Sequence, residues 1–231
     1  MNILCIIPAR KNSKGIVNKN IKLIHNKPLI FYTISEAKKS KIINDIVISS
    51  DSLNIKRISK KYNIKNFSLR PKHLASDKST IDKTLKYELQ RIEKIKKKKY
   101  EIIVLLQPTS PLRKGRIIDK SINFFLKNYK KYDSLITISK FEEPNPFKTF
   151  IIQNKKLKKL INHRTKSDTP PRQEFPEVYI PNGMIYIFKR INVLKKEKIL
   201  GKNIYGYKTT SNFVNIDNKK DLILAKKFLK N

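Results

Sequence analysis

Short apolar runs alternate along this chain with segments in which apolar residues recur every three or four positions. Residues 3–7 form a continuous apolar run that ends at Pro8. A run of this length and character is typical of a strand buried on both faces of a sheet. By the same reasoning, strands are predicted at residues 3–7, 46–50, 102–106, 134–139, 179–188 and 205–209.

Helical periodicity fills most of the intervals between these runs. From residue 28 to residue 40, Ile30, Ile34 and Ala37 fall on one face, and Pro28 suits the first turn of a helix. Helices are predicted at residues 28–40, 54–62, 82–98, 115–127 and 221–229.

This alternation predicts an α/β fold with a mostly parallel sheet and helices on both faces. The chain has 231 residues, which suffice for one sizeable core but are few for two full domains, so residues 1–231 are expected to form a single domain. Residues 142–181 are the exception to the short connections: they are rich in Pro, Lys and Asn and lack a clear helical period. We interpret them as an insertion, either a lid, a hairpin or an arm for dimerisation.

The charge of the chain is strongly positive. Lys and Arg number 53 against 18 Asp and Glu, a formal net charge of +35. Such an excess is typical of partners that are nucleic acids, anionic membranes or polyanionic substrates. The lysines, however, lie in scattered helical runs such as residues 96–99, and the abundance of Lys, Ile and Asn matches an AT-rich coding sequence. We therefore interpret the charge as compositional drift and keep nucleic-acid binding, with its steep salt dependence, as an alternative.

Cysteine and histidine usage limits the chemistry. Cys5 is the only cysteine, which excludes a disulfide within the chain and a cluster of thiolate ligands. It lies in an apolar run and is interpreted as a small buried side chain. His25, His73 and His163 lack metal-ligand spacing, and we assign them no role. No apolar run is long enough for a signal peptide or a membrane span, so we expect a soluble, cytoplasmic protein without membrane contact.

Polar residues gather where the predicted strands end, which is where open α/β sheets bind ligands. Residues 8–20 follow the first strand and contain four cations. A triphosphate needs fixed cations and backbone N–H groups, so this loop is a candidate phosphate site; a solvated basic loop is the alternative. The Walker A spacing is absent. The polar residues of the loop are Arg10, Lys11, Asn12, Ser13, Lys14, Asn18, Lys19 and Asn20, with Gly15 among them.

Three later segments also carry candidate ligand-binding residues. Gln107 follows an apolar run and lies near two prolines. Prolines make the backbone rigid, which would hold the Gln107 side chain in a fixed direction. Arg172, assisted by Lys148, could hold a carboxylate, and a surface cation is the alternative for each. Asn215 and Asp217 alternate along what we predict to be a strand, and their oxygens could hold Mg²⁺. The alternative for this pair is the N-terminal cap of the last helix.

Taken in order, these motifs resemble the CMP-N-acylneuraminate synthetases, also called acylneuraminate cytidylyltransferases. The resemblance covers nearly the whole chain, and its first two motifs together are highly specific. The matching segments are IPAR at residues 7–10, SKG at 13–15, KN at 19–20, LQPTSPLR at 106–113, PRQ at 171–173, PNG at 181–183, IY at 185–186, ID at 216–217 and DL at 221–222.

The resemblance implies a three-layer α/β/α nucleotidyltransferase fold and a role for each motif. It implies that the anomeric hydroxyl of a nonulosonic acid attacks the α-phosphate of CTP and releases pyrophosphate, with Mg²⁺ as cofactor. It also implies a homodimer in which the insertion places a partner's residues at the sugar pocket. Arg10, Lys19 and Arg172 are implied to carry catalysis. By motif, the triphosphate would be bound by Arg10, Ser13, Lys14 and Lys19, and the cytidine end by Asn20, Arg70 and Ser79. The sugar would be bound by Gln107, Lys148 and Arg172, and the metal by Asp217 with Asn215.

Two departures from the family pattern bear on activity. Lys11 and Asn12 stand where the family usually has two glycines, and lysine tolerates a left-handed backbone poorly. Asn215 stands where the family usually has the first aspartate of Asp-x-Asp, so one carboxylate is lost at the metal site. These departures leave a regulatory relative without turnover as an alternative. Legionaminic acid or another 2-keto sugar acid is the alternative to sialic acid as substrate.

Overall fold

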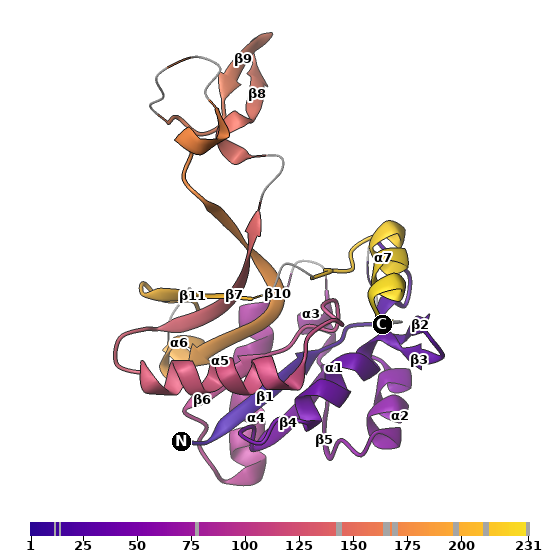
Figure 1. Ribbon diagram of the computed structural model, residues 1–231. Coiled ribbons are helices and arrows are strands. Elements are labelled where there is room, and N and C mark those ends of the chain that lie inside the picture. The colour runs from indigo at the N-terminus through magenta and orange to yellow at the C-terminus, as the bar shows by residue number, and fades with distance from the viewer. Residues whose placement is uncertain are drawn as a thin grey trace.

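The computed structural model describes residues 1–11, 13, 15–76, 79–141, 145–163, 167, 171–195, 199–209 and 213–229, except for the side chain of Arg172. Within these residues, seven strands form one sheet in the order β11-β7-β10-β6-β1-β4-β5 (Figure 1). The strands are β1 Ile3–Pro8, β4 Asp45–Ser50, β5 Asn66–Leu69, β6 Ile102–Leu105, β7 Ser134–Phe141, β10 Val178–Lys189 and β11 Ile204–Lys208.

The sheet is mostly parallel, as predicted. β1 pairs in parallel with β4 and β6, β4 with β5, and β7 with β11. β10 runs antiparallel to both of its neighbours, β6 and β7. Each predicted strand between residues 3 and 209 is present. The edge strand β5 was not predicted, because only one of its four residues, Ser68, is buried and no apolar run marks it.

Helices cover both faces of the sheet. Their bounds are α1 Leu29–Lys38, α2 Leu53–Lys61, α3 Lys72–Ala75, α4 Ile81–Lys96, α5 Gly115–Lys127, α6 Arg190–Lys195 and α7 Lys219–Leu229. Short 3-10 turns occur at η1 Lys19–Ile21, η2 Pro146–Lys148 and η3 Arg172–Glu174, and two hairpins form from β2 Leu23–Ile24 with β3 Lys27–Pro28 and from β8 Phe150–Gln153 with β9 Lys156–Lys159. The predicted helices are confirmed to within a few residues.

The alternation of side chains along β1 explains why its whole sequence is apolar. Cys5 and its neighbours on one side pack into a core cluster with α1 and α5, whereas Leu4 and Ile6 pack on the other side with α4. Both faces are therefore removed from water, which stabilises the sheet by roughly 25 cal/mol for each Å² of apolar surface buried. Burial raises the pKa of the Cys5 thiol to about 12, which confirms its interpretation as a small buried side chain.

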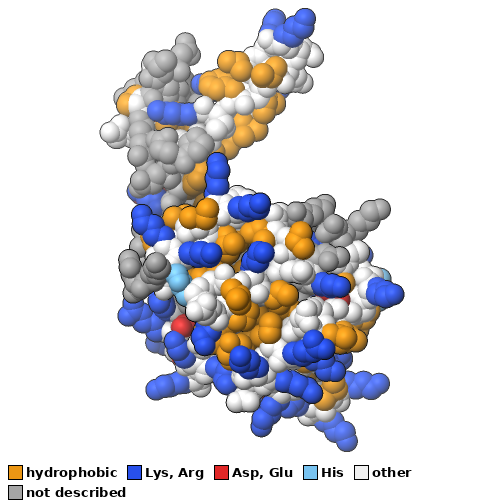
Figure 2. Space-filling model, turned by 90° about the vertical axis from the view of Figure 1, so that its right-hand side faces the viewer, with side chains coloured by type: hydrophobic (Ala, Val, Ile, Leu, Met, Phe, Trp, Pro, Cys, Tyr) orange, Lys and Arg blue, Asp and Glu red, His pale blue; other side chains and the backbone are white. Residues whose placement is uncertain are grey.

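An arm projects from one end of the sheet between β7 and β10. The two strands pair over Ser134–Phe141, and the end of this ladder, from Ser139 to Phe141, extends beyond the pairing with β11 and β6. The β8–β9 hairpin lies at the far end of the arm (Figure 1). The hairpin leaves large apolar side chains in solvent: Ile152 is 79% exposed and Leu157 is 70% exposed. Figure 2 shows hydrophobic side chains, in orange, on the surface of the arm at the top of the molecule. The arm thus presents apolar side chains that no described part of this chain covers.

The prediction that Asn215 and Asp217 lie in a strand is wrong. Residues 214–217 are extended but belong to no strand, and the backbone N–H of Ile216 donates to the carbonyl of Thr109, 2.9 Å away. Val214 and Ile216 are buried, so the sequence alternates as in a strand although no neighbouring strand pairs with it. The cap of α7 is formed by Asn218, whose Oδ1 accepts from the N–H of Asp221 at 3.1 Å.

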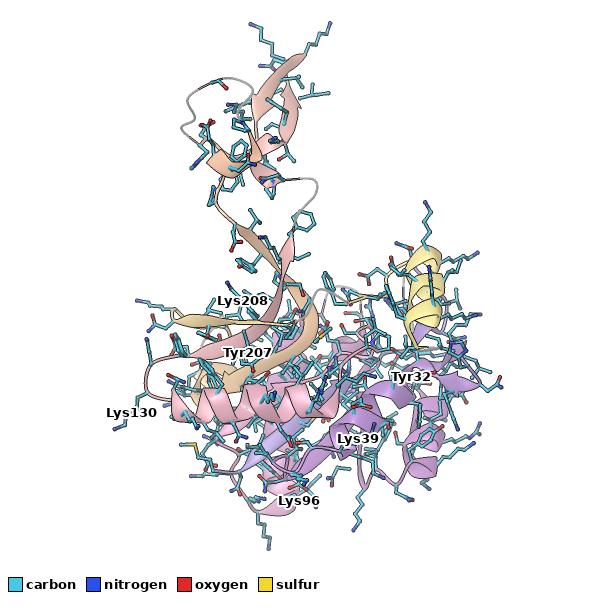
Figure 3. All side chains as sticks on the ribbon, viewed as in Figure 1. Tyr32, Lys39, Lys96, Lys130, Tyr207 and Lys208 are labelled. Atoms are coloured by element: carbon cyan, nitrogen blue, oxygen red, sulfur yellow. The ribbon has the colours of Figure 1, made fainter. Side chains whose placement is uncertain are left out.

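The basic side chains are dispersed over the surface. Lys39, Lys96 and Lys130 come from different parts of the chain, are all exposed, and lie apart from one another in Figure 3. On the face shown in Figure 2, Lys and Arg side chains are likewise spread out and do not form one stripe. Among the residues that the structure describes, no helix is long and apolar enough to cross a membrane.

Candidate active site

An open cavity of about 580 Å³ lies beyond the carboxyl ends of β1 and β6. Its walls come from four parts of the chain: the loop after β1, the segment from β5 to the start of α4, the turn after β6, and the extended segment before α7. Most of the residues that the sequence assigned to a site meet here, namely Arg10, Ser13, Lys19, Asn20, Arg70, Ser79, Gln107, Asn215 and Asp217.

Three of the assigned residues are not placed in this cavity. Lys148 lies in η2 of the arm, where its Nζ is 5.6 Å from the ring centre of Phe175. The backbone of Arg172 lies in η3, also in the arm, and its side chain lies outside the described part of the chain. Lys14 lies outside the described residues as well. The structure therefore does not bring Lys148 to the cavity of its own chain.

Lys19 joins the first loop to the segment before α7. Its Nζ donates to the carbonyl of Ile216 at 2.6 Å and lies 3.1 Å from Oδ1 of Asp217. The other carboxylate oxygen of Asp217 accepts from Nδ2 of Asn215 at 3.3 Å. Gly15 lies against the same segment, since a Cβ there would collide with the carbonyl oxygen of Asp217. Phosphate-binding and metal-binding candidates thus share one wall of the cavity.

Backbone contacts hold the first loop in place and accommodate Lys11. The N–H of Lys11 donates to Oδ1 of Asp51 at 2.7 Å, and Nδ2 of Asn20 donates to the carbonyl of Arg10 at 2.9 Å. Among the described residues of this loop, Asn18 has a positive φ angle, 54°, and Lys11 does not. A lysine at position 11 is therefore compatible with the observed backbone. Lys11 does not line the cavity.

Arg70 and Ser79 line the cavity from the segment between β5 and α4. Burial lowers the pKa of the Arg70 guanidinium, and the nearby carboxylates of Glu88 and Asp51 oppose this shift. Oγ of Ser79 is buried and hydrogen-bonded to no other described residue. Leaving a buried hydroxyl unpaired costs free energy, so a ligand that contacted Ser79 would supply a partner that the described residues do not.

Arg113 holds the turn that carries Gln107, a role that sequence reasoning missed. The side chain is fully buried: Nη2 donates to the carbonyl of Gln107 at 2.8 Å and Nη1 donates to Oγ1 of Thr33 at 3.0 Å. Its Nε donates to the carbonyl of Met184 in β10. Burial lowers the pKa of Arg113 to about 10. The sequence signal was the arginine itself at the end of LQPTSPLR, but its partners lie on α1 and β10.

We expect Arg113→Met to destabilise the fold by about 2 kcal/mol or more. Methionine keeps most of the volume, but the carbonyl of Met184 loses the Arg113 donor. The carbonyl of Gln107 keeps only its longer contacts, from the Ser110 N–H at 3.3 Å and the Thr33 hydroxyl at 3.5 Å. A buried acceptor left unpaired costs about 1–3 kcal/mol. Urea unfolding measures the change. Arg116→Met is the matched control, because Arg116 is exposed and should change stability by no more than about 0.5 kcal/mol. Equal losses in the two variants would contradict the role of Arg113.

The residues present fit a magnesium ion that is shared with a bound triphosphate. Among the residues that the structure describes, no three His, Cys, Asp or Glu side chains gather as a closed metal site. Mg²⁺ usually keeps several waters and takes one or two carboxylates together with substrate phosphates. Asp217 is 68% exposed and faces the cavity with Asn215. An open site of this kind suits such an ion.

The sequence profile of the cytidylyltransferase family matches residues 4–229. This chain belongs to the cytidylyltransferase family. It is therefore a nucleotidyltransferase, as the motifs around Arg10, Gln107 and Asp217 indicated.

Curated relatives agree with the resemblance found in the motifs. The chain is 36% identical over 201 residues to post-translational flagellin modification protein B of Campylobacter coli and, equally, to CMP-N,N'-diacetyllegionaminic acid synthase of Campylobacter jejuni; each match covers 87% of this chain and 83% of the relative. It is 30% identical over 230 residues to N-acylneuraminate cytidylyltransferase of Escherichia coli, which covers 96% of this chain and 51% of that protein. The chain thus spans about half the length of this last relative.

Solved structures confirm the fold. CMP:2-keto-3-deoxy-manno-octonic acid synthetase, complexed with CTP, superposes with a TM-score of 0.73 at 15% identity, covering 100% of this chain and 99% of that one. 4-Diphosphocytidyl-2C-methyl-D-erythritol synthase of Anaerococcus prevotii superposes with a TM-score of 0.64 at 14% identity, covering 100% and 96%. The chain therefore has the α/β nucleotidyltransferase fold that the resemblance implied.

Proposed function

We propose that this enzyme transfers CMP from CTP to the anomeric hydroxyl of a nonulosonic acid and releases pyrophosphate. The hydroxyl oxygen forms a bond to the α-phosphorus of CTP, and the bond from that phosphorus to the oxygen bridging to the β-phosphate breaks. The observation that carries the proposal is that one cavity joins the cations of the first loop to Arg70, Gln107 and Asp217.

The first loop would bind the triphosphate. Arg10, Ser13 and Lys19 line one side of the cavity, and Lys14 would add a further cation. A transferring phosphoryl group gains little from covalent chemistry, so a cytidylyltransferase must rely on positioning and on charge neutralisation. Two fixed cations at the cavity wall would supply both. We assign catalysis to Arg10 and Lys19, together with Arg172 on the sugar side.

Residues from three parts of the cavity lining would bind the cytidine end of CTP and the sugar. Arg70, Ser79 and Asn20 line the cavity and would hold the cytidine end. Asn20 also holds the carbonyl of Arg10, so its amide shapes the loop as well as the site. Gln107, aimed by Arg113, would contact the acidic sugar.

Asp217, with Asn215, would hold Mg²⁺. When bound, the ion would neutralise charge on the phosphate oxygens of CTP. Lys19 forms an ion pair with the carboxylate of Asp217, so the lysine and the metal ion would act on the same phosphate groups of CTP. The lost carboxylate at Asn215 suggests weaker metal binding than an Asp-x-Asp pair would give.

We further propose that the arm completes the sugar site of a second subunit in a homodimer. Two observations support this. Lys148 does not reach the cavity of its own chain, and the β8–β9 hairpin exposes an apolar face that includes Ile152 and Leu157. An exposed face of this kind marks an interaction surface.

Pyrophosphate release tests the reaction. Purified protein is incubated with CTP, Mg²⁺ and one of four acids: N,N'-diacetyllegionaminic acid, N-acetylneuraminic acid, pseudaminic acid or Kdo. We expect release with the first, because the legionaminic acid synthase is 36% identical to this chain and the N-acylneuraminate enzyme is 30% identical. If folded protein that still binds CTP releases no pyrophosphate with any of the four acids, the proposal is contradicted. That result would favour a regulatory relative without turnover.

Arg172→Ala is expected to raise KM for the sugar acid about 10-fold to 100-fold and to leave KM for CTP unchanged. A hydrogen bond to a charged group contributes about 1.5–3 kcal/mol, and this one would be lost to the sugar carboxylate. Steady-state kinetics with each substrate varied in turn measure the split. Lys156→Ala, an exposed change in the same arm, is the control. Equal KM values for the sugar in variant and native protein would contradict the assignment.

Mixing variants tests whether the site is shared between subunits. If Arg172 acts in the partner's cavity, a heterodimer of Arg172→Ala and Lys19→Ala subunits contains one site with both native residues. Mixing the two impaired proteins should then restore activity, up to about a quarter of the native value if subunits exchange at random. Activity equal to the mean of the two variants would place Arg172 and Lys19 in the same chain's site.

A further inference from the structure

Glu88 is a fully buried carboxylate that does not line the cavity. It lies in α4 with 0% of its surface exposed. Burying a charge costs several kcal/mol unless the charge is paired and hydrogen-bonded. Its Oε1 accepts from Oγ of Ser49 at 2.6 Å, and its Oε2 accepts from Nε of Arg91 at 3.2 Å. Arg91 supplies the counter-charge on the side of α4, whereas Ser49 leads from Glu88 towards the cavity.

Ser49 connects Glu88 to Arg70. Its Oγ accepts from Nε of Arg70 at 3.0 Å, and its carbonyl accepts from Nη2 of Arg70 at 2.9 Å. A carboxylate only accepts hydrogen bonds and a guanidinium only donates them. The single hydroxyl proton of Ser49 must therefore point to Glu88, and its lone pairs must face Arg70. Glu88 and Arg70 together therefore fix the orientation of the Ser49 hydroxyl.

This chain of contacts fixes one edge of the Arg70 guanidinium. Nε and Nη2 are engaged by Ser49, and no described residue is hydrogen-bonded to Nη1. Arg70 lines the cavity on the same wall as Ser79. Arg70 is only 7% exposed, so we take Nη1, the guanidinium nitrogen that no described residue engages, as the group that meets a ligand.

We propose that Glu88 is a positioning residue that orients Arg70, through Ser49, towards the nucleoside end of CTP. The inference rests on the proposed function, since it takes the nucleotide in this cavity to be CTP. Glu88 touches no substrate in this account. Its negative charge holds the Ser49 hydroxyl as an acceptor, and that acceptor holds Arg70.

Binding of CTP without sugar tests the proposal. Ser49→Ala removes the connecting hydroxyl, and Glu88→Gln removes the charge with little change of shape. Each variant should bind CTP about 10-fold more weakly in calorimetric titration, as expected for one impaired charge-assisted contact. Affinity for inorganic tripolyphosphate, which lacks the nucleoside, should stay within about 2-fold of the native value. In an Arg70→Ala background, Ser49→Ala should cause no further loss, because both changes act on one interaction.

Ser68→Ala is the matched control. Ser68 lies opposite Ser49 in the β4–β5 register, is equally buried, and its Oγ is bonded to no other described residue. It should leave CTP affinity unchanged. The proposal is overturned if Ser49→Ala or folded Glu88→Gln binds CTP as the native protein does. It is also overturned if tripolyphosphate binding falls as much as CTP binding, or if Ser68→Ala has the same effect as Ser49→Ala. Should Glu88→Gln fail to fold, Ser49→Ala carries the test alone. If the protein binds CTP but does not transfer CMP to a sugar acid, the proposed reaction is contradicted. The binding test of Glu88 and Ser49 remains valid in that case.

Discussion

Lys19→Ala should lower kcat about 100-fold to 1000-fold. Removing one fixed charge or donor from the group that stabilises a transition state has a cost of this size. The Lys19 ammonium is largely buried at the cavity wall and is held there by the Ile216 carbonyl and by Asp217. It can therefore meet the charge that builds up on the transferring phosphoryl group without first being reorganised. Initial rates of pyrophosphate release at saturating substrates measure the effect.

The fold should tolerate this substitution. The partner of Lys19, Asp217, is 68% exposed, so water can solvate its carboxylate once the lysine is gone. Lys22→Ala is the matched control: Lys22 lies three residues further on, is exposed and does not line the cavity. Native kcat in Lys19→Ala, or an equal loss in Lys22→Ala, would contradict the assignment of Lys19 to catalysis.

Strands buried on both faces could be predicted from the sequence, whereas the two edge strands differed: β11 was predicted at residues 205–209 and β5 was not. β1 shows a continuous apolar run because its two faces pack against different layers of helices. β5 has only one buried residue and leaves no such run. The segment at residues 214–217 alternates like a strand because Val214 and Ile216 are buried. Whether an alternating segment pairs with a neighbouring strand depends on the tertiary structure, which the local pattern does not contain.

The same limit applies to the site. The polar residues at strand ends were found in the sequence because each follows an apolar run or belongs to a specific motif. The supporting residues were not found, because their partners are distant in the chain. Arg113 donates to Thr33, 80 residues earlier, and Glu88 accepts from Ser49, 39 residues earlier. Such a residue looks like any polar residue in a loop or helix until the fold places its partners beside it.

Asp217→Ala should lower kcat at least about 100-fold and raise the Mg²⁺ concentration needed for half-maximal rate. Asp217 is the one carboxylate among the described residues that line the cavity, so its loss removes the strongest oxygen ligand available for the ion. The same change releases Lys19 from its ion pair, which weakens the positioning of a catalytic cation. Rates measured over a Mg²⁺ titration separate the two effects, because only the first is relieved by more metal.

Asn215→Asp is the opposite change, because it adds a carboxylate to the same metal site. It would place a second carboxylate beside Asp217, where the Asn215 amide now donates to that side chain at 3.3 Å. Two carboxylates hold Mg²⁺ more tightly than one, so half-maximal rate should be reached at a lower Mg²⁺ concentration. Without metal the two like charges repel, so the variant should be less stable than the native protein in EDTA and should recover when Mg²⁺ is added. A Mg²⁺ requirement that neither substitution shifts would show that the metal binds elsewhere, and Asp217 would then act only by holding Lys19.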